Sequence, residues 1–342
     1  MSTLHRPWLA LGVALPLALG ACQSSSNEVE TAPELDEAEK AEELLTQGLV
    51  QFSARNYGQA TAIFESAVEL AELSGDEGLL VEVLACAGNG HFAQGDLEAG
   101  FPWLERAAVY ATAEVPRGWV RYLGVRGRYE RQSDELEAAR ATFEELYAFC
   151  REDGRAKAAL DAAHMRALVA ADDDEMIEWS GRALAEAREE GSVRWQAVLW
   201  NNLGWKFDEL DRLEDAHQAL VQARDFHRQG GDALAVLIAD WSVAHSLRRL
   251  ERVGEAKTML DDVLMRAYAL ERSGQREQAL EWVGFTHWEL GEVALLEGRA
   301  VEASAALANA RQTLVQVGIE SWAPDMLEDL DASLLRAAAL AP

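Results

Sequence analysis

The histidine, cysteine and glycine residues of this sequence could do chemistry, but their spacing argues against an active site. No two of the seven His stand three or four residues apart, the spacing that would place both around one metal ion on a helix. No His precedes a Glu and no Gly precedes a Lys, so H-E-x-x-H and the phosphate-binding G-x-x-x-x-G-K are missing. G-x-S-x-G and C-x-x-C are missing too. The sequence therefore predicts a protein with no catalytic activity, no cofactor and no dedicated metal site.

The acidic run at residues 172–175, DDDE, is a local cluster that could suggest calcium binding. A helix-loop-helix calcium loop also carries a turn glycine and a distal bidentate glutamate, and neither is present here. Acidic side chains are favoured at the positive N-terminal end of a helix. We therefore interpret this run as a solvated turn that leads into a helix.

The charge of the chain excludes another class of function. Its 31 Lys and Arg face 59 Asp and Glu, which gives a formal net charge of -28. Nucleic-acid-binding domains carry a basic patch or stripe that neutralises phosphates, whereas an acidic surface repels them. We therefore predict no nucleic-acid partner.

Residues 1–22 have the pattern of a bacterial secretion signal. Arg6 precedes an apolar stretch over residues 8–19 that is too short for a stable transmembrane helix. Residues 19–22, LGAC, resemble a lipobox, after which bacterial lipoprotein signals are cut and the new terminal Cys is acylated with fatty acids such as palmitate. We predict a signal peptide over residues 1–21 and lipidation of Cys22. The alternative is a plain signal peptide with an incidental Cys.

The segment that follows reads as a spacer. Residues 22–40 are polar, acidic and rich in Ser, with few large apolar side chains to bury, so we predict a flexible tether there. Resemblance to lipoproteins of enteric bacteria implies that Gln23, at the position after the acylated Cys, favours the outer membrane. The expected location is the bacterial cell envelope, at the periplasmic face of the outer membrane.

Helix breakers divide the rest of the chain at a spacing of about 40 residues, which is typical of a solenoid. The main breaks fall at Gly75, Pro116, Gly154, Gly191, Gly230, Gly274 and Gly318. A weaker break lies within each interval, at Asn56, Gly95, Ser133, Asp172, Asp211, Arg252 and Gly298. Each unit is therefore predicted to be two helices joined by a turn.

The clearest unit is WNNLGWKFDELDRLEDAHQALVQARDF, which starts at Trp200. Trp200, Leu203, Gly204 and Phe207 share one helical face, and a second face of the same kind follows from Leu213. This pattern resembles the tetratricopeptide repeat and its W-x-x-L-G-x-x-Y signature, with Phe207 in place of Tyr.

Aligning the other units on this one gives three columns at matched positions. The first-helix column is Gly48, Gly88, Gly127, Leu168, Gly204, Ala244 and Gly291. The second helices supply Ala60, Gly100, Ala139, Ser180, Ala216, Ala256 and Ala303, each followed four residues later by Phe64, Leu104, Phe143, Leu184, Leu220, Leu260 and Leu307. The resemblance implies an all-α, right-handed superhelical α-solenoid of about seven helix-turn-helix repeats over residues 41–323.

Three features depart from the family pattern. Leu168 stands where a small residue is expected, and the interval before the seventh repeat is long. A period of about 40 also exceeds the usual ~34, which implies helices longer by about a turn in total.

Residues 324–342 form one amphipathic pattern, and we predict a C-terminal capping helix that covers the last repeat.

Cys86 and Cys150 lie within helical patterns and far apart in the sequence. An oxidising compartment would permit a disulfide between them. Free cysteine is among the most buried small residues, so we favour two buried thiols.

The resemblance implies that first helices line a concave groove that binds extended peptides or helices. Asn202 matches the Asn that in family members often bonds a peptide backbone, and Arg could pair with a ligand carboxylate. The residues at the expected exposed positions are Asn89, Arg121, Arg128, Arg166, Asn201, Asn202, Trp205, Trp241, His245, Arg248 and Trp288. The alternative for the Trp residues is packing between repeats.

Two functions fit this architecture. The first is a non-catalytic protein- or peptide-binding scaffold or adaptor, held at the membrane by its lipid anchor. The second is a peptide-responsive regulatory sensor whose superhelix changes conformation when a ligand binds. The sequence does not name the partner or the oligomeric state.

Overall fold

The computed structural model describes residues 35–272 and 276–340, and every regular element within these ranges is helical. The predicted all-α class is therefore confirmed. The predicted signal peptide, Cys22 and most of the predicted tether lie outside the described residues.

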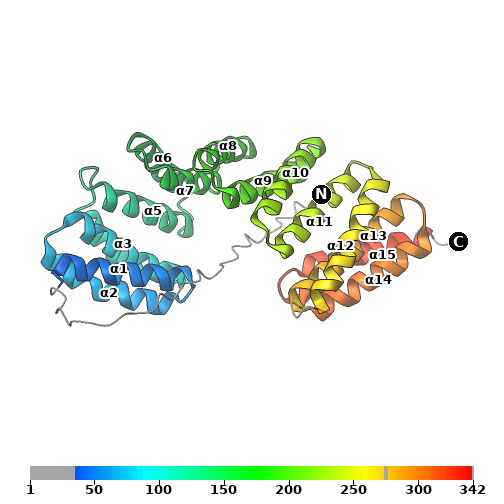
Figure 1. Cartoon of the computed structure of the whole chain (residues 1–342), viewed down its shortest axis with the longest axis horizontal. Helices are drawn as coiled ribbons and strands as arrows, with labels where there is room; N and C mark the ends of the chain where they lie inside the picture. The colour runs from blue at the N-terminus through cyan, green and yellow to red at the C-terminus, as the bar shows by residue number, and fades with distance from the viewer. Residues whose placement is uncertain (1–34, 273–275, 341–342) are drawn as a thin grey trace, which may run out of the picture. The chain divides into compact units, whose positions relative to one another are not determined.

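Fifteen α-helices and one short 3-10 helix follow one another along the described chain (Figure 1). Their bounds are α1 Glu37–Ser53, α2 Tyr57–Ser74, α3 Glu77–Ala93, α4 Leu97–Ala108, α5 Pro116–Gln132, α6 Leu136–Glu152, α7 Ala156–Ala167, α8 Asp173–Glu189, α9 Val193–Glu209, α10 Leu213–Gly230, α11 Ala233–Arg249, α12 Val253–Arg272, α13 Arg276–Leu296, α14 Ala300–Gln316, η1 Ile319–Ser321 and α15 Pro324–Leu340.

Helix α1 begins four residues earlier than the predicted start of the repeats at residue 41. The Asp36 side chain accepts a hydrogen bond from the Glu39 backbone N–H, and the Glu39 carboxylate accepts one from the Asp36 N–H. This reciprocal capping box satisfies two N–H groups that have no partner inside the helix. The last residues of the predicted tether are therefore helical.

The turns inside the repeats share one backbone feature. Each contains a residue with positive φ, and these residues are Arg55, Gly95, Asp134, Asp211, Glu251 and Gly298. They lie at or next to the predicted weaker breaks. The fourth repeat differs, because five residues separate the end of α7 at Ala167 from the start of α8 at Asp173. Between repeats, Gly75, Gly154 and Gly191 also have positive φ, as does Gly231 rather than the predicted Gly230.

The predicted small-residue column confirms the repeat register. A Cβ atom on Gly127 would lie 2.6 Å from the Phe143 ring, and one on Gly204 would lie 2.6 Å from Leu220 Cγ. Gly48 against Phe64 and Gly291 against Leu307 have the same relationship. Each of these glycines therefore lets the large side chain of the second helix rest on the backbone of the first.

The fourth repeat does not follow this register, so the assignment of Leu168 was wrong. Leu168 lies just past the last residue of α7, at its C-terminal cap, and is 51% exposed. Helix α7 spans only 12 residues, and its buried small residues are Ala159, Ala162 and Ala163. The short helix places the close-packing position before residue 168.

The chain forms two compact units, one that ends at Glu186 and one that begins at Ala187. We call them unit 1 and unit 2. The core of unit 1 includes Leu84, Leu123 and Phe143, and that of unit 2 includes Leu260 and Leu307.

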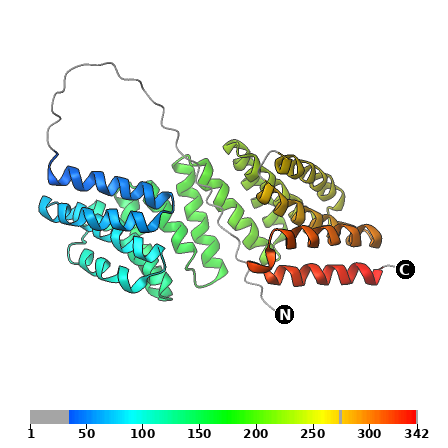
Figure 2. The ribbon, with the colours of Figure 1, turned by 90° about the horizontal axis from the view of Figure 1, so that it is seen from below.

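At the end of unit 2, α15 lies alongside α14 (red and orange in Figure 2). Its buried face includes Leu327, Leu330 and Ala337. Arg311 of α14 forms an ion pair with Asp331 of α15 at 2.6 Å. This face covers the last repeat with apolar side chains.

Both cysteines in the described chain are free and buried, so the disulfide alternative was wrong. Burial raises the pKa of the Cys86 thiol to about 11, and burial raises that of Cys150 to about 11 as well. These thiols behave as small apolar core residues.

Candidate binding surface on the first helices

The predicted lining residues lie on the first helices of the repeats in both units. Unit 1 supplies them from α3, α5 and α7, which carry Asn89, Arg121, Arg128 and Arg166. Unit 2 supplies them from α9, α11 and α13, which carry Asn201, Asn202, Trp205, Trp241, His245, Arg248 and Trp288. We call the sides of these helices that bear these residues the first-helix surface of each unit.

Four of the predicted lining residues are buried, so their assignment to an exposed lining was wrong. Arg166 is 2% exposed, Trp205 8%, Trp241 5% and His245 5%. Their neighbours on adjacent helices cover them, as the contacts below show. Asn202 is exposed, and the other six are partly exposed.

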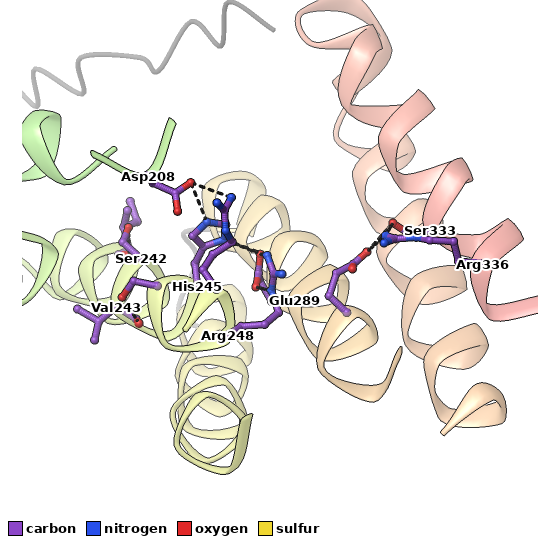
Figure 3. A network of polar contacts seen from close by, with 12 residues as sticks. Asp208, Ser242, Val243, His245, Arg248, Glu289, Ser333 and Arg336 are labelled. Atoms are coloured by element: carbon purple, nitrogen blue, oxygen red, sulfur yellow. Dashed lines mark hydrogen bonds and ion pairs between the residues drawn. The ribbon is translucent and has the colours of Figure 1, made fainter. Parts of the chain in front are cut away.

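A buried network of charged side chains joins three first helices of unit 2 (Figure 3). His245 of α11 lies between two carboxylates, with Nδ1 2.9 Å from Glu289 Oε1 of α13 and Nε2 3.4 Å from Asp208 Oδ2 of α9. Arg248 donates from Nε to the second Glu289 oxygen at 2.5 Å. Arg249 reaches the Asp208 carboxylate at 3.4 Å. Helix α11 is therefore linked to α9, the first helix of the repeat before it, and to α13, the first helix of the repeat after it.

The charges in this network shift one another's pKa values. Burial alone would lower the pKa of His245, but the Glu289 charge and the hydrogen bonds that the ring donates to both carboxylates raise it above its ordinary value. Burial alone would raise the pKa of Glu289, but Arg248 and His245 hold it far below its ordinary value. Both shifts favour the charged forms.

Aromatic rings pack beside the network. The Trp241 ring lies 6.0 Å from that of Trp205, 5.8 Å from the His245 imidazole and 5.3 Å from Trp282, measured between centroids. Phe285 is 5.9 Å away on the other side. The packing alternative therefore holds for Trp205 and Trp241, which join repeats instead of presenting a surface to a ligand.

A second set of polar contacts, nearer the C-terminus, joins α13 to α15. Glu292 of α13 accepts hydrogen bonds from Ser333, and from Arg336 at 2.7 Å, both of α15. In these contacts α9 thus contributes an acidic side chain, α11 basic ones, α13 acidic ones and α15 a basic one. This alternation pairs each helix with the next.

In unit 1, ion pairs between first helices also join consecutive repeats, but other residues form them. Arg117 and Arg121 of α5 both contact Glu82 of α3, the latter at 3.2 Å. Arg128 donates to Asp161 of α7 at 2.6 Å. The predicted arginines are thus engaged by internal carboxylates, a correction to their expected availability for a ligand.

Arg166 is the most enclosed of these cations. It pairs with Glu144 at 2.7 Å and with Glu175, and its guanidinium lies 5.2 Å from the Trp179 ring centroid. Glu175 belongs to the acidic run that we predicted to be a solvated turn. The turn prediction is therefore incomplete, because one of its acids fixes α7 to α8.

Within the described chain, Asn202 is exposed and forms no hydrogen bond through its side chain. Asn201 on the same helix and Trp288 on α13 are partly exposed. These residues offer polar groups and aromatic area on helices that also take part in the buried network.

A separate depression of about 430 Å³ in unit 2 is lined by residues of the first helix α11 and of the second helices α10 and α12. Its floor includes the buried Asp240, which pairs with Arg228 at 2.8 Å and with Arg266 at 2.7 Å. The other acids of the lining are paired too, Glu255 with Arg252 at 2.7 Å and Asp262 with Arg266 at 2.9 Å.

Two kinds of feature are absent from the residues that the structure describes. No group of three or more His, Cys, Asp or Glu there could hold a metal ion. No helix in the same ranges combines the length and the apolar character that membrane crossing needs.

Solved structures resemble this chain, although no protein-family model and no curated protein matches it. A signal-transduction ATPase with numerous domains and a tetratricopeptide repeat sensor, from Pyrococcus horikoshii, superposes with a TM-score of 0.67 at 13% identity. The match covers 84% of this chain and 43% of that one, so this chain spans less than half of that protein. The chain has the tetratricopeptide-repeat fold.

A Rap protein complexed with competence and sporulation factor also matches, with a TM-score of 0.46, 16% identity and coverage of 82% of this chain and 78% of that one. At such identities the comparisons describe the fold alone. They do not transfer a partner or an activity.

Sequence reasoning missed the carboxylates that complete the networks, namely Glu82, Asp161, Asp208 and Glu289. A signal was available in the tetratricopeptide-repeat alignment. Glu289 stands 44 residues after His245, and Glu82 stands 39 before Arg121, close to one repeat in each case. Opposite charges at matched positions of consecutive repeats therefore indicate contacts between first helices.

Proposed function

We propose that this protein is a non-catalytic scaffold or adaptor that binds a protein or peptide partner through the first-helix surface of unit 2. The observation that carries the proposal is that the exposed Asn202 lies on a helix held in place by buried contacts. Asn202 lies on α9, and α9 is tied to α11 by the contacts of Asp208 with His245 and Arg249.

The chemistry of this surface favours recognition of a peptide backbone. An asparagine amide can donate to a main-chain carbonyl and accept from a main-chain N–H at the same time. Trp288 adds aromatic area with few rotatable bonds. The arginines are bound to internal carboxylates, so a ligand carboxylate would have to displace one of them. Binding through Asn and Trp requires no such exchange.

The test is crosslinking in intact cells followed by purification of this chain. A scaffold is expected to recover one large protein partner, and Asn202→Ala should reduce its affinity several-fold without loss of fold, since a hydrogen bond contributes about 0.5–1.5 kcal/mol. The matched control is Arg188→Ala, an exposed change at the end of α8. If only the control variant lowered the affinity, the interface would have to be assigned to a surface other than the first helices.

A regulatory sensor is the second candidate. Its support is the similar fold of a protein whose repeat region is described as a sensor. Recovery of a short peptide instead of a large protein, with measurable compaction of the chain on binding, would favour this candidate over the scaffold.

We also propose that the chain is a lipoprotein at the periplasmic face of the bacterial outer membrane. The support is the sequence pattern of residues 1–22, with Cys22 after LGA and Gln23 next to it. Growth with labelled fatty acid is expected to label the protein, and Cys22→Ser should abolish the label. A native protein that never takes up the label would contradict this proposal.

A further inference from the structure

We propose that His245 is a proton-controlled clamp, which joins three consecutive repeats of unit 2 while its imidazole is protonated and loosens them when it is not. The inference does not depend on which ligand the protein binds. It rests on the position of one ring between two buried carboxylates (Figure 3).

Both ring nitrogens of His245 face a carboxylate, and Arg248 Nη2 lies 3.3 Å from Nδ1 as well. Nδ1 faces Glu289 of α13 at 2.9 Å and Nε2 faces Asp208 of α9 at 3.4 Å. A carboxylate can only accept, so both contacts are hydrogen bonds only in the imidazolium, whereas a neutral ring has a single N–H. Loss of the proton therefore turns a nitrogen lone pair toward one of the carboxylates.

Water cannot easily replace the lost donor, because the site is enclosed. The side chains of His245, Asp208 and Glu289 are only 7%, 7% and 8% exposed. The rings of Trp205 and Trp241 lie 5.0 and 5.8 Å from the imidazole. An unsatisfied charge in such surroundings is costly, which makes the contact sensitive to the proton.

Two arginines complete the surroundings of the ring. Arg248 pairs with Glu289, and Arg249 pairs with Asp208 and with Asp211, which is 84% exposed. The buried carboxylates of this set are Asp208 and Glu289, and the His245 ring lies between them.

The remaining charged groups around α11 have partners elsewhere. Glu292 of α13 pairs with Arg336, and His217 of α10 contacts Ser246. Arg228 of α10 and Arg266 of α12 pair with Asp240, which lies beside the separate depression. None of these contacts replaces the proton of His245.

The direction of the pH effect follows from the raised pKa of His245. Its contribution to stability is fully present below the ordinary value near 6.5, and it is lost as the pH rises through the raised value in the folded protein. Mild alkalinisation should therefore weaken the coupling of α9, α11 and α13, with little effect on unit 1.

The test uses the full chain and two measurements. In the first, His245 of the wild-type chain is titrated by NMR, with its ring signal assigned through bonds from its own backbone resonances. In the second, hydrogen exchange of α9, α11 and α13 is followed from pH 6 to 9 and corrected for intrinsic rates. Protection in these helices should fall by up to tenfold per pH unit between the ordinary and the raised pKa, while α5 stays unchanged.

The matched control is His287→Gln. His287 is half-buried on α13 and contacts Tyr268, and burial lowers its pKa below the ordinary value, the opposite direction to His245. The control should keep the pH dependence, and His245→Gln should abolish it. A wild-type His245 that titrates at or below 6.5, or protection with the same pH dependence in wild type and His245→Gln, would overturn the proposal. The wild-type titration decides the matter even if the variant fails to fold.

Discussion

Glu289 lies 2.9 Å from His245, although the two residues are 44 positions apart and belong to consecutive repeats. Together with the contacts of Arg248 and Asp208, this pair couples repeats of unit 2 through buried charge as well as through apolar packing. Because each charge depends on the others, removal of one member should cost more than the loss of one contact.

Glu289→Gln should destabilise unit 2 by about 3–5 kcal/mol, since it leaves His245 and Arg248 as buried cations without their carboxylate. Urea unfolding at pH 6 measures the effect. Glu297→Gln is the matched control, because Glu297 is 39% exposed and solvent screens its pairing with Arg299, which should therefore contribute little to stability. Equal midpoints for the two variants would show that the buried network adds nothing.

Gly127→Ala should destabilise unit 1 by roughly 1–3 kcal/mol, because the new Cβ would lie 2.6 Å from the fully buried Phe143 ring. Gly181→Ala is the same change in α8, where a Cβ would meet nothing within 4 Å. That variant should be neutral or more stable by up to about 1 kcal/mol. Thermal melts of both variants test the repeat register, which would be wrong if they shifted alike.

Leu203→Asp should unfold or strongly destabilise unit 2. Leu203 is 4% exposed, so the substitution buries a charge with no partner. Leu335→Asp makes the same change on α15 at a side chain that is 72% exposed, and it should shift the melting temperature little. A similar loss in both variants would mean that the buried face of α9 is assigned incorrectly.

Cys86 and Cys150 should resist thiol reagents in the folded protein. Burial raises both pKa values to about 11, so at pH 8 only about one thiol in a thousand is ionised, and access is blocked as well. In a Cys22→Ser variant, iodoacetamide should label neither residue at pH 8 and both after addition of urea. Rapid labelling without denaturant would contradict the burial of these helices.

The sequence predicted the repeats well because their determinants are local. Glycine at Gly127 and Gly204 allows close helix contact, and one left-handed residue in each of six turns ends a helix at a fixed place. The fourth repeat was aligned incorrectly, because the short α7 and the longer turn after it shift the repeat register. No single residue in the sequence indicates that shift.

The candidate site was harder to predict, because burial on first helices depends on the neighbouring repeat. Trp205 and His245 occupy positions that would be exposed on one isolated hairpin. In the structure, the rings of Trp241 and the carboxylates of Asp208 and Glu289 cover them. Asn202, on the same helix as Trp205, stays exposed.

The most direct test of the binding surface places a photoreactive amino acid at Asn202, and in a separate variant at Val301, which is 77% exposed on the second helix α14. Both variants are irradiated in intact cells, and adducts are detected by blotting and mass spectrometry. A discrete adduct from position 202 and none from position 301 is the predicted result. Adducts from position 301 alone would contradict the assignment of binding to the first-helix surface.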